Sequence, residues 1–230
     1  MIKLFKILFI IIPLLFNGCS FMMSRMIPIN DIEKPTGEYS IGTEIFEWID
    51  NDREEWFSEE EGDRRKLIVQ VWYPSVSPGK KRDPWVDNSS QRVDPIIEEF
   101  PMPKFIARAI DRIDTDSYID TSPITKGSFP VIIFSHGFES WRSQNTTQIQ
   151  ELVSHGYIVF ALDHTYDALL TIFKDGTKIE RAKKYCHGCN TEEFYKVFSP
   201  QINTRIEDIR FIINQVEKIK TGEIKSNISG

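Results

Sequence analysis

The chain has 230 residues and a mass of 26.8 kDa, with 40% hydrophobic and 12% aromatic residues, enough for one domain with a substantial core. Its formal net charge is −6, which excludes a broad basic surface and argues against nucleic acid as the main partner. The acidity by itself does not identify a substrate.

The N-terminal residues have the layout of a signal peptide. Two lysines precede an apolar segment, Ile7 to Phe16, which is shorter than the roughly 20 apolar residues of a membrane span. The segment ends near Cys19, in a sequence that resembles the lipobox of bacterial lipoproteins. We therefore expect a signal peptide over residues 1–19, a lipid on Cys19 and a tether over residues 20–34. The alternatives are a simple secretory signal and an uncleaved anchor. We expect an exported protein, either a cell-envelope lipoprotein or a secreted protein.

Two further cysteines, Cys186 and Cys189, lie on either side of His187. In an oxidising compartment they can form a local disulfide, and unpaired thiols are the other simple outcome. Half of a zinc site, with His187 as a third ligand, is a further alternative. Because no second Cys or His pair lies at a suitable spacing, we expect no metal. We also expect no cofactor.

Two strands are predicted at the start of the domain, which we place at residues 35–230. Tyr39 to Trp48 approximates the alternation of a strand, and Arg65 to Tyr73 alternates clearly before Pro74. The acidic segment between them, Asp50 to Asp63, predicts a solvated loop. The two strands are therefore expected to pair antiparallel.

The segment from Ser75 to Lys126 contains many prolines and charges. Its one helix-like patch is Ile96 to Ile113. Long connections of this kind are often functional covers, so we expect an excursion over the top of the sheet.

A strand, a helix and a second strand follow. Pro130 to Phe134 is an uninterrupted apolar run, which is typical of a buried parallel strand. Asn145 to His155 predicts a helix, and Tyr157 to Leu162 a second parallel strand. Because ligands bind at the carboxyl ends of parallel strands, the segments 135–138 and 163–167 are candidates for chemistry.

The last part of the chain predicts an insertion and a helix. Residues 168–199 carry the cysteine pair and predict an insertion above the site. Ile202 to Ile219 has isoleucines at helical spacing with charges between them, which indicates an amphipathic helix against the sheet. Gly222 ends this helix, and residues 223–230 form a polar tail.

A series of short motifs occurs in a fixed order along these elements: Pro35-Thr36-Gly37, Gly42-Thr43, Val69 to Pro74, Phe134-Ser135-His136-Gly137-Phe138, Arg142, Leu152 to Tyr157, and Asp163-His164. The series resembles the plasma-type platelet-activating-factor acetylhydrolases and their bacterial relatives. The resemblance covers about residues 35–219.

The resemblance implies an α/β-hydrolase fold, of which this chain would form the N-terminal half: a mostly parallel sheet with helices on both faces. It also implies a calcium-independent serine carboxylester hydrolase that removes short or oxidised acyl groups from phospholipids. The backbone N–H of Phe138 would be one oxyanion-hole donor, and Gly137 would permit close approach of the substrate. His136 and Arg142 would support this turn.

One element of the family pattern is absent. The nucleophile elbow Gly-x-Ser-x-Gly occurs nowhere in these residues. We therefore expect no catalytic residue in this chain, with the nucleophile, Asp and His all downstream, a reading frame truncated before the nucleophile strand and a chain that is inactive alone. Without that strand, residues 131–134 would form an exposed apolar edge.

The histidines present offer no replacement for the missing elbow. We expect structural roles for His136 and His155, while His164 with Asp163 and Asp167 forms the best alternative polar cluster. Neighbouring Ser and His side chains on one turn generally point apart, so no unconventional triad is expected at Ser135. Arg142 can hold a phosphate or form a structural salt bridge.

Two other functions remain open. One is a non-catalytic surface lipoprotein that binds a lipid or a protein partner through the same cleft. The other is an esterase that acts on other small esters. The expected partners are therefore a phospholipid or small ester, and a membrane surface reached through the lipid anchor.

Overall fold

The computed structural model describes residues 32–107, 109–110, 113–182 and 190–229. The predicted signal peptide, most of the tether, Cys19 and the Cys186–Cys189 pair lie outside these residues. Residues 84–114 fall in one compact unit, and residues 32–83 with 115–230 fall in another. No helix in the described ranges is both long enough and apolar enough to cross a membrane.

The smaller unit contains two short helices where the sequence predicted one helical patch. They are α2 (Ser89–Glu99) and α3 (Lys104–Ala107). Pro101 and Pro103 lie between them. The helix α2 accommodates Pro95 in its interior, but two prolines within three residues remove two N–H donors and disfavour helical geometry in the residues before them, so a break there is favoured. The expected role of this segment as a cover stays a prediction.

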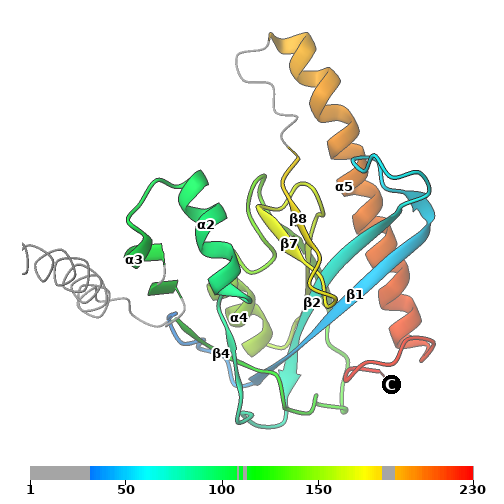
Figure 1. The fold of residues 1–230 in the computed structure, drawn as a ribbon. Coiled ribbons are helices and arrows are strands. Elements are labelled where there is room, and N and C mark those ends of the chain that lie inside the picture. Colours follow the sequence, from blue (N-terminus) through cyan, green and yellow to red (C-terminus); the bar gives the residue numbers. More distant parts are fainter. Residues whose placement is uncertain (1–31, 108, 111–112, 183–189, 230) are drawn as a thin grey trace, which may run out of the picture. The chain divides into compact units, whose positions relative to one another are not determined.

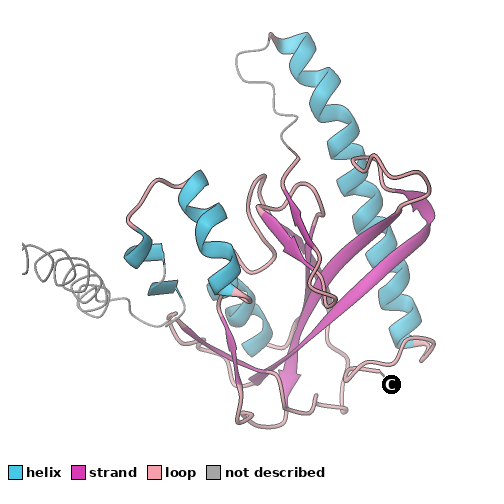
Figure 2. Ribbon diagram, viewed as in Figure 1, coloured by secondary structure: helices cyan, strands magenta, loops and turns pink. Residues whose placement is uncertain are grey.

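The larger unit is built on a six-stranded sheet with the order β3-β4-β1-β2-β6-β5, drawn in magenta in Figure 2. The strand β2 runs antiparallel to both neighbours, whereas the β5–β6 and β1–β4 pairs are parallel, so the sheet is mixed. The strands are β1 (Ser40–Glu54), β2 (Arg64–Ser75), β3 (Arg82–Pro84), β4 (Asp114–Tyr118), β5 (Val131–Ser135) and β6 (Ile158–Asp163).

Helices cover both faces of this sheet, as predicted (Figure 1). Alternate residues of a strand point to opposite faces, so Trp72 of β2 packs on one side and Val71 and Tyr73 on the other. The Trp72 side is covered by α4 (Thr146–Ser154), and the other side by α5 (Thr191–Lys220). Core residues of the α4 face are Ile41, Trp72, Ile149, Val153, Val159 and Ala161. Those of the α5 face include Phe46, Trp48, Leu67, Val69, Phe160, Leu162, Ile212 and Ile219.

Some boundaries differ from the predicted ones. The strand β1 continues to Glu54, so the predicted acidic loop begins later. The predicted insertion contains a hairpin of β7 (Leu170–Ile172) and β8 (Lys178–Glu180) and also the start of α5. This helix begins eleven residues before Ile202 because Asn190 caps it: the Asn190 side chain accepts from two backbone N–H groups, and Glu193 accepts from the Asn190 N–H.

The strand β5 lies at the edge of the sheet. Within the described residues it pairs only with β6, and Val131 is 45% exposed. The prediction that residues 131–134 form an edge strand is therefore confirmed for the part of the chain that the structure describes; Val131 is exposed there, and residues 132–134 are half-buried.

Candidate functional site

The turn at residues 135–138 and the turn at residues 163–167 lie side by side. They follow β5 and β6, which are parallel neighbours with their carboxyl ends at the same end of the sheet. Buried His136 joins the two turns. Its Nε2 accepts from the backbone N–H of His164 at 3.1 Å, and its Nδ1 donates to the carbonyl of Gly137 at 2.6 Å. Burial lowers the pKa of His136, which favours the neutral ring that this pattern requires. His136 therefore occupies a structural position between the turns.

The backbone N–H of Phe138 has no hydrogen-bond acceptor among the described residues, although both neighbouring amides do. Gly137 donates to Gln144 Oε1 at 3.1 Å, and Glu139 donates to the carbonyl of Asp167 at 3.3 Å. Glu139 also has a φ of 63°, a left-handed conformation that is costly for a residue with a side chain. The hydrogen bonds of Gly137 and Glu139 thus hold the backbone on both sides of Phe138, and the Phe138 N–H has no acceptor among the described residues.

The fold itself does not require glycine at position 137. A Cβ built there would meet only the Gln144 amide, at 3.7 Å, which is an ordinary van der Waals separation. Any requirement for Gly137 would come from a bound substrate.

Arg142 forms a buried salt bridge rather than an open anion site. Its Nη1 lies 2.5 Å from Asp163 Oδ2, its backbone N–H donates to the same carboxylate at 2.7 Å, and its Nε donates to Gln70 at 3.1 Å. Because the side chain is 2% exposed and its hydrogen-bonding groups are engaged, Arg142 anchors the segment before α4 to the end of β6.

The structure also links three residues that the sequence did not connect: Ser135, His164 and Asp208. Ser135 Oγ lies 2.9 Å from His164 Nε2, and His164 Nδ1 lies 2.8 Å from Asp208 Oδ2. Asp208 also pairs with Arg65 at 2.7 Å and with Arg53 at 2.9 Å. The order of the three groups matches that of a serine, histidine and aspartate triad.

The surroundings of this chain of hydrogen bonds oppose nucleophilic chemistry. Burial lowers the pKa of His164 to about 4, in spite of the opposing effect of Asp208, so the ring is a weak base. Burial opposes ionisation of Asp208, but Arg65 and His164 together hold its pKa below the usual range. The carboxylate can only accept, so Nδ1 carries the proton and Nε2 accepts from Ser135. A fixed structural link fits these properties better than an activated serine.

Arg205 of α5 binds both turns and covers Ser135. Its guanidinium donates to Ser135 Oγ at 2.9 Å, to Asp167 Oδ2 at 2.6 Å and to the carbonyl of His136. It also lies over the Phe138 ring, 4.8 Å from the centroid. Arg205 therefore connects α5 to the turn that carries the Phe138 N–H.

Sequence reasoning missed Arg205 and Asp208 because it followed the isoleucine stripe of this helix. Both residues lie within the predicted helix and are three positions apart. Residues at that spacing share a helix face, so a second, polar face was a signal that could have been found.

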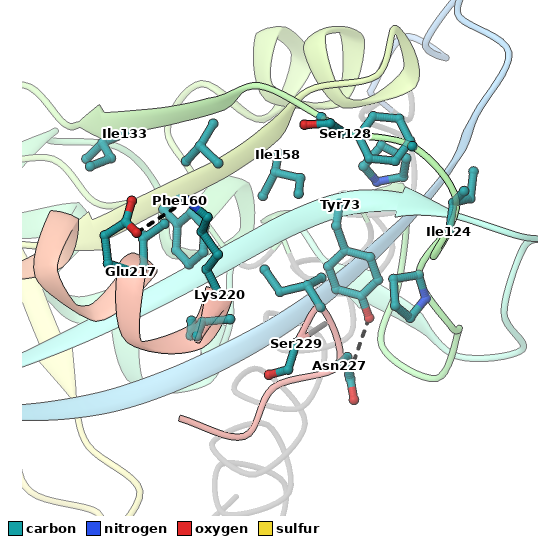
Figure 3. Close-up of a pocket in the computed structure, with 18 of the residues that line it drawn as sticks. Tyr73, Ile124, Ser128, Ile133, Ile158, Phe160, Glu217, Lys220, Asn227 and Ser229 are labelled. Carbon is teal, nitrogen blue, oxygen red and sulfur yellow. Dashed lines mark hydrogen bonds and ion pairs between the residues drawn. The ribbon is translucent and has the colours of Figure 1, made fainter. Parts of the chain in front are cut away.

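A large cavity among the described residues lies away from these turns. It has a volume of about 760 Å³ and lies between the β5 edge and α5 (Figure 3). Its walls are mostly apolar, and Asn227 donates to the Tyr73 hydroxyl at 3.3 Å on one side. Its lining includes Val131, Ile133, Phe160, Ile209, Ile213 and Val216. The cavity thus lies along the edge strand β5 and not at the two turns that carry the candidate oxyanion donor. No group of three or more metal-ligating side chains occurs in the described ranges.

Comparison with known proteins gives consistent matches. Residues 27–230 match the family described as "Platelet-activating factor acetylhydrolase, isoform II". A platelet-activating factor acetylhydrolase of Cavia porcellus is 25% identical over 186 residues, which cover 78% of this chain. A solved structure of a ferulic acid esterase from Streptomyces cinnamoneus is 24% identical over 80% of this chain, with a TM-score of 0.61. This likeness supports the α/β-hydrolase fold.

The matches cover only part of each relative. The chain spans 38% of the length of the Cavia porcellus protein and 48% of the esterase chain.

Proposed function

Because this chain belongs to the platelet-activating factor acetylhydrolase, isoform II family, we propose that it forms the oxyanion-binding part of a carboxylester hydrolase. The observation that carries this proposal is the unsatisfied N–H of Phe138, held between two hydrogen-bonded amides at the carboxyl ends of β5 and β6. Such a donor suits a negative charge that develops on a carbonyl oxygen.

The proposed reaction uses this N–H in the tetrahedral intermediate. When a serine oxygen attacks the acyl carbon, the C=O bond opens and its electron pair moves to the oxygen. A fixed N–H at that oxygen is worth roughly 3 kcal/mol. The intermediate then collapses: the C–O bond to the alcohol breaks, and the alcohol leaves with the proton that the serine hydroxyl lost. Water cleaves the acyl-serine bond in a second transfer, which releases the acid and restores the serine hydroxyl. Arg205 and Glu139 keep the N–H in place, so little reorganisation is needed.

The nucleophile of this reaction is proposed to lie outside these 230 residues. The sequence contains no Gly-x-Ser-x-Gly motif, and Ser135 is covered by Arg205. The edge position of β5 leaves room for a neighbouring strand. We therefore expect the 230 residues alone to show no turnover of short-chain nitrophenyl esters. A coding sequence that continued from these residues into an apolar strand and the elbow would support this proposal, and turnover by the 230 residues alone would contradict it.

A matched pair of variants tests the role of Phe138 in a protein that carries both parts. Phe138→Pro removes the N–H and is expected to lower kcat about 10²-fold or more on acetylated phospholipid. Phe138→Ala keeps the N–H and should keep most of kcat. Equal losses in two folded variants would contradict the proposal.

The proposed substrates are phospholipids with short or oxidised acyl groups, as the family resemblance implies. Parallel assays on acetylated phospholipid and on small soluble esters separate this substrate from other esters. If a protein that carries the elbow binds these compounds but cleaves none, it is a lipid-binding lipoprotein instead.

Export and anchoring form a separate proposal that rests on residues 1–19. The lysines, the apolar segment and Cys19 support cleavage and lipidation, which would place the site at a membrane surface. Cells grown with labelled palmitate should label the protein, and Cys19→Ala should abolish the label. Labelling that survives this substitution would contradict lipidation at Cys19.

A further inference from the structure

An aromatic wall lies against the candidate oxyanion turn; we define it as Phe138, Phe194, Tyr195 and Phe198. The Phe138 ring meets the Phe198 ring edge to face at 5.4 Å, and Phe198 stacks on Phe194 at 4.1 Å. Tyr195 lies 5.8 Å from Phe194. Phe194 and Phe198 are four residues apart on α5 and so share one helix face.

Three of the four rings are exposed, and Phe198 is half-buried. Phe138 is 43% exposed, Phe194 42% and Tyr195 61%. Single exposed apolar residues are ordinary, but a contiguous group marks a surface that binds something. The first turns of α5, orange in Figure 1, extend past the end of the sheet and carry three of the four rings.

The wall is fixed where it meets the turn. The Arg205 guanidinium lies over the Phe138 ring at 4.8 Å and also binds Asp167 at 2.6 Å. A cation over an aromatic face is an attractive contact, so this ring is held in place before any ligand arrives.

We infer that the aromatic wall binds the apolar part of the ester whose carbonyl oxygen is held by the Phe138 N–H. This inference rests on the proposed function, because it uses Phe138 as the oxyanion donor. Phe138 supplies both the backbone N–H donor and the first ring of the wall. An ester whose carbonyl oxygen accepts from this N–H therefore has its acyl or alkoxy group close to the aromatic rings. The wall therefore selects esters with an aromatic or medium-length aliphatic group over esters that carry only small groups.

A non-cleavable ketone tests this binding without a nucleophile. 4-Phenyl-2-butanone offers a carbonyl oxygen and an apolar ring, whereas acetone offers the carbonyl alone. In ¹H–¹⁵N spectra of the ¹⁵N-labelled 230-residue chain, the phenyl ketone is expected to shift the Phe138 and Phe198 amides and to saturate. Acetone should shift neither amide over the same concentration range. Saturation without a shift of the Phe138 amide, or equal binding of acetone, would overturn the inference.

Variants locate the site. Phe198→Ala should weaken ketone binding about fivefold, and Phe198→Trp should restore it, since aromatic contacts of this size supply that factor. Phe194→Ala, at a more exposed position, replaces Phe198→Ala if the spectrum shows that the latter is unfolded. The control is Ile213→Ala, an exposed residue of the 760 Å³ cavity.

Loss of ketone binding in Ile213→Ala but not in the phenylalanine variants would place the ketone in the cavity and overturn the inference. So would sedimentation with phosphatidylcholine vesicles that depends on Phe198 while the ketone does not bind, because the wall would then be a membrane contact. Ketone binding needs no catalysis, so the absence of esterase activity in a protein with the elbow would sink the proposed function and leave this binding site standing.

Discussion

Acidification from pH 7 to pH 5 should destabilise this protein chiefly through His164. The ring is fully buried between Ser135 and Asp208, and burial lowers its pKa from 6.5 to about 4. In the unfolded chain the same histidine titrates near 6.5. As the pH falls through 6.5, the unfolded state therefore binds a proton that the folded state does not bind until about pH 4.

The difference between the pKa of His164 in the folded and the unfolded chain sets the direction and the size of the change in the free energy of unfolding. The stabilisation by neutral His164 is complete above pH 6.5 and is lost as the pH falls toward 4. Between pH 7 and pH 5 the linkage relation gives a loss of about 2 kcal/mol. His136, whose pKa is also lowered by burial, acts in the same direction. The lowered pKa of Asp208 contributes stability that is lost only at more acidic pH.

Urea unfolding at the two pH values, followed by tryptophan fluorescence, measures the change through the midpoint and slope. The His164→Asn variant should be less stable at pH 7 and should lose most of the pH dependence. His155→Gln is the control, because His155 lies exposed at the end of α4, and it should retain the pH dependence. A loss below about 0.5 kcal/mol in the wild-type chain, or an unchanged loss in His164→Asn, would refute the reasoning.

Four further outcomes are expected. Asp208→Ala leaves Arg65 buried without its closest partner and should lower the free energy of unfolding in urea by about 3 to 5 kcal/mol. Glu207→Ala, at an exposed position of the same helix, should lower it by less than about 0.5 kcal/mol. Similar losses in the two variants would contradict the buried network. Gly42→Ala places a Cβ into the Tyr73 ring and should lower the free energy of unfolding by about 1 to 3 kcal/mol, while Gly137→Ala should stay within about 0.5 kcal/mol. Val131→Lys adds a charge to the open β5 edge and should reduce self-association in light scattering, and unchanged association would show that this edge is not the contact. A fluorophosphonate should leave Ser135 unmodified because Arg205 covers its hydroxyl; labelling that disappears in Ser135→Ala would instead show that this serine is a nucleophile.

The parts of the fold that could be predicted are those with a local signal. The apolar runs of β5 and β6, the alternation of β2 and the isoleucine spacing of α5 reflect burial of one strand or helix at a time. That residues 131–134 would form an edge followed instead from the strand order implied by the family resemblance, together with the missing elbow. The boundaries that differed depend on local chemistry outside those patterns, such as the Asn190 cap and the prolines between α2 and α3.

Only part of the candidate site could be predicted from local signals in the sequence. The sequence placed the turn at residues 135–138 and the turn at residues 163–167 at the same end of the sheet, because both follow parallel strands. The family resemblance, and not the pattern itself, implied that Phe138 is a backbone donor. It did not place Arg205 or Asp208 there, since these residues come from a helix 70 and 44 positions away from Ser135 and His164. A side chain that reaches across from another element leaves no periodic trace near the turn it supports.

The sequence by itself therefore determined the strand–helix–strand unit, the motif order and the absence of an elbow, which are all properties of neighbouring residues. Only the tertiary structure decided which polar groups meet at the ends of β5 and β6. Packing α5 against the sheet fixed Ser135, His164 and Asp208 in one chain of hydrogen bonds and brought the aromatic wall beside the Phe138 turn. Burial in this packed structure lowers the pKa of His164. Burial and long-range contact are properties of the packed chain, so no local pattern could contain them.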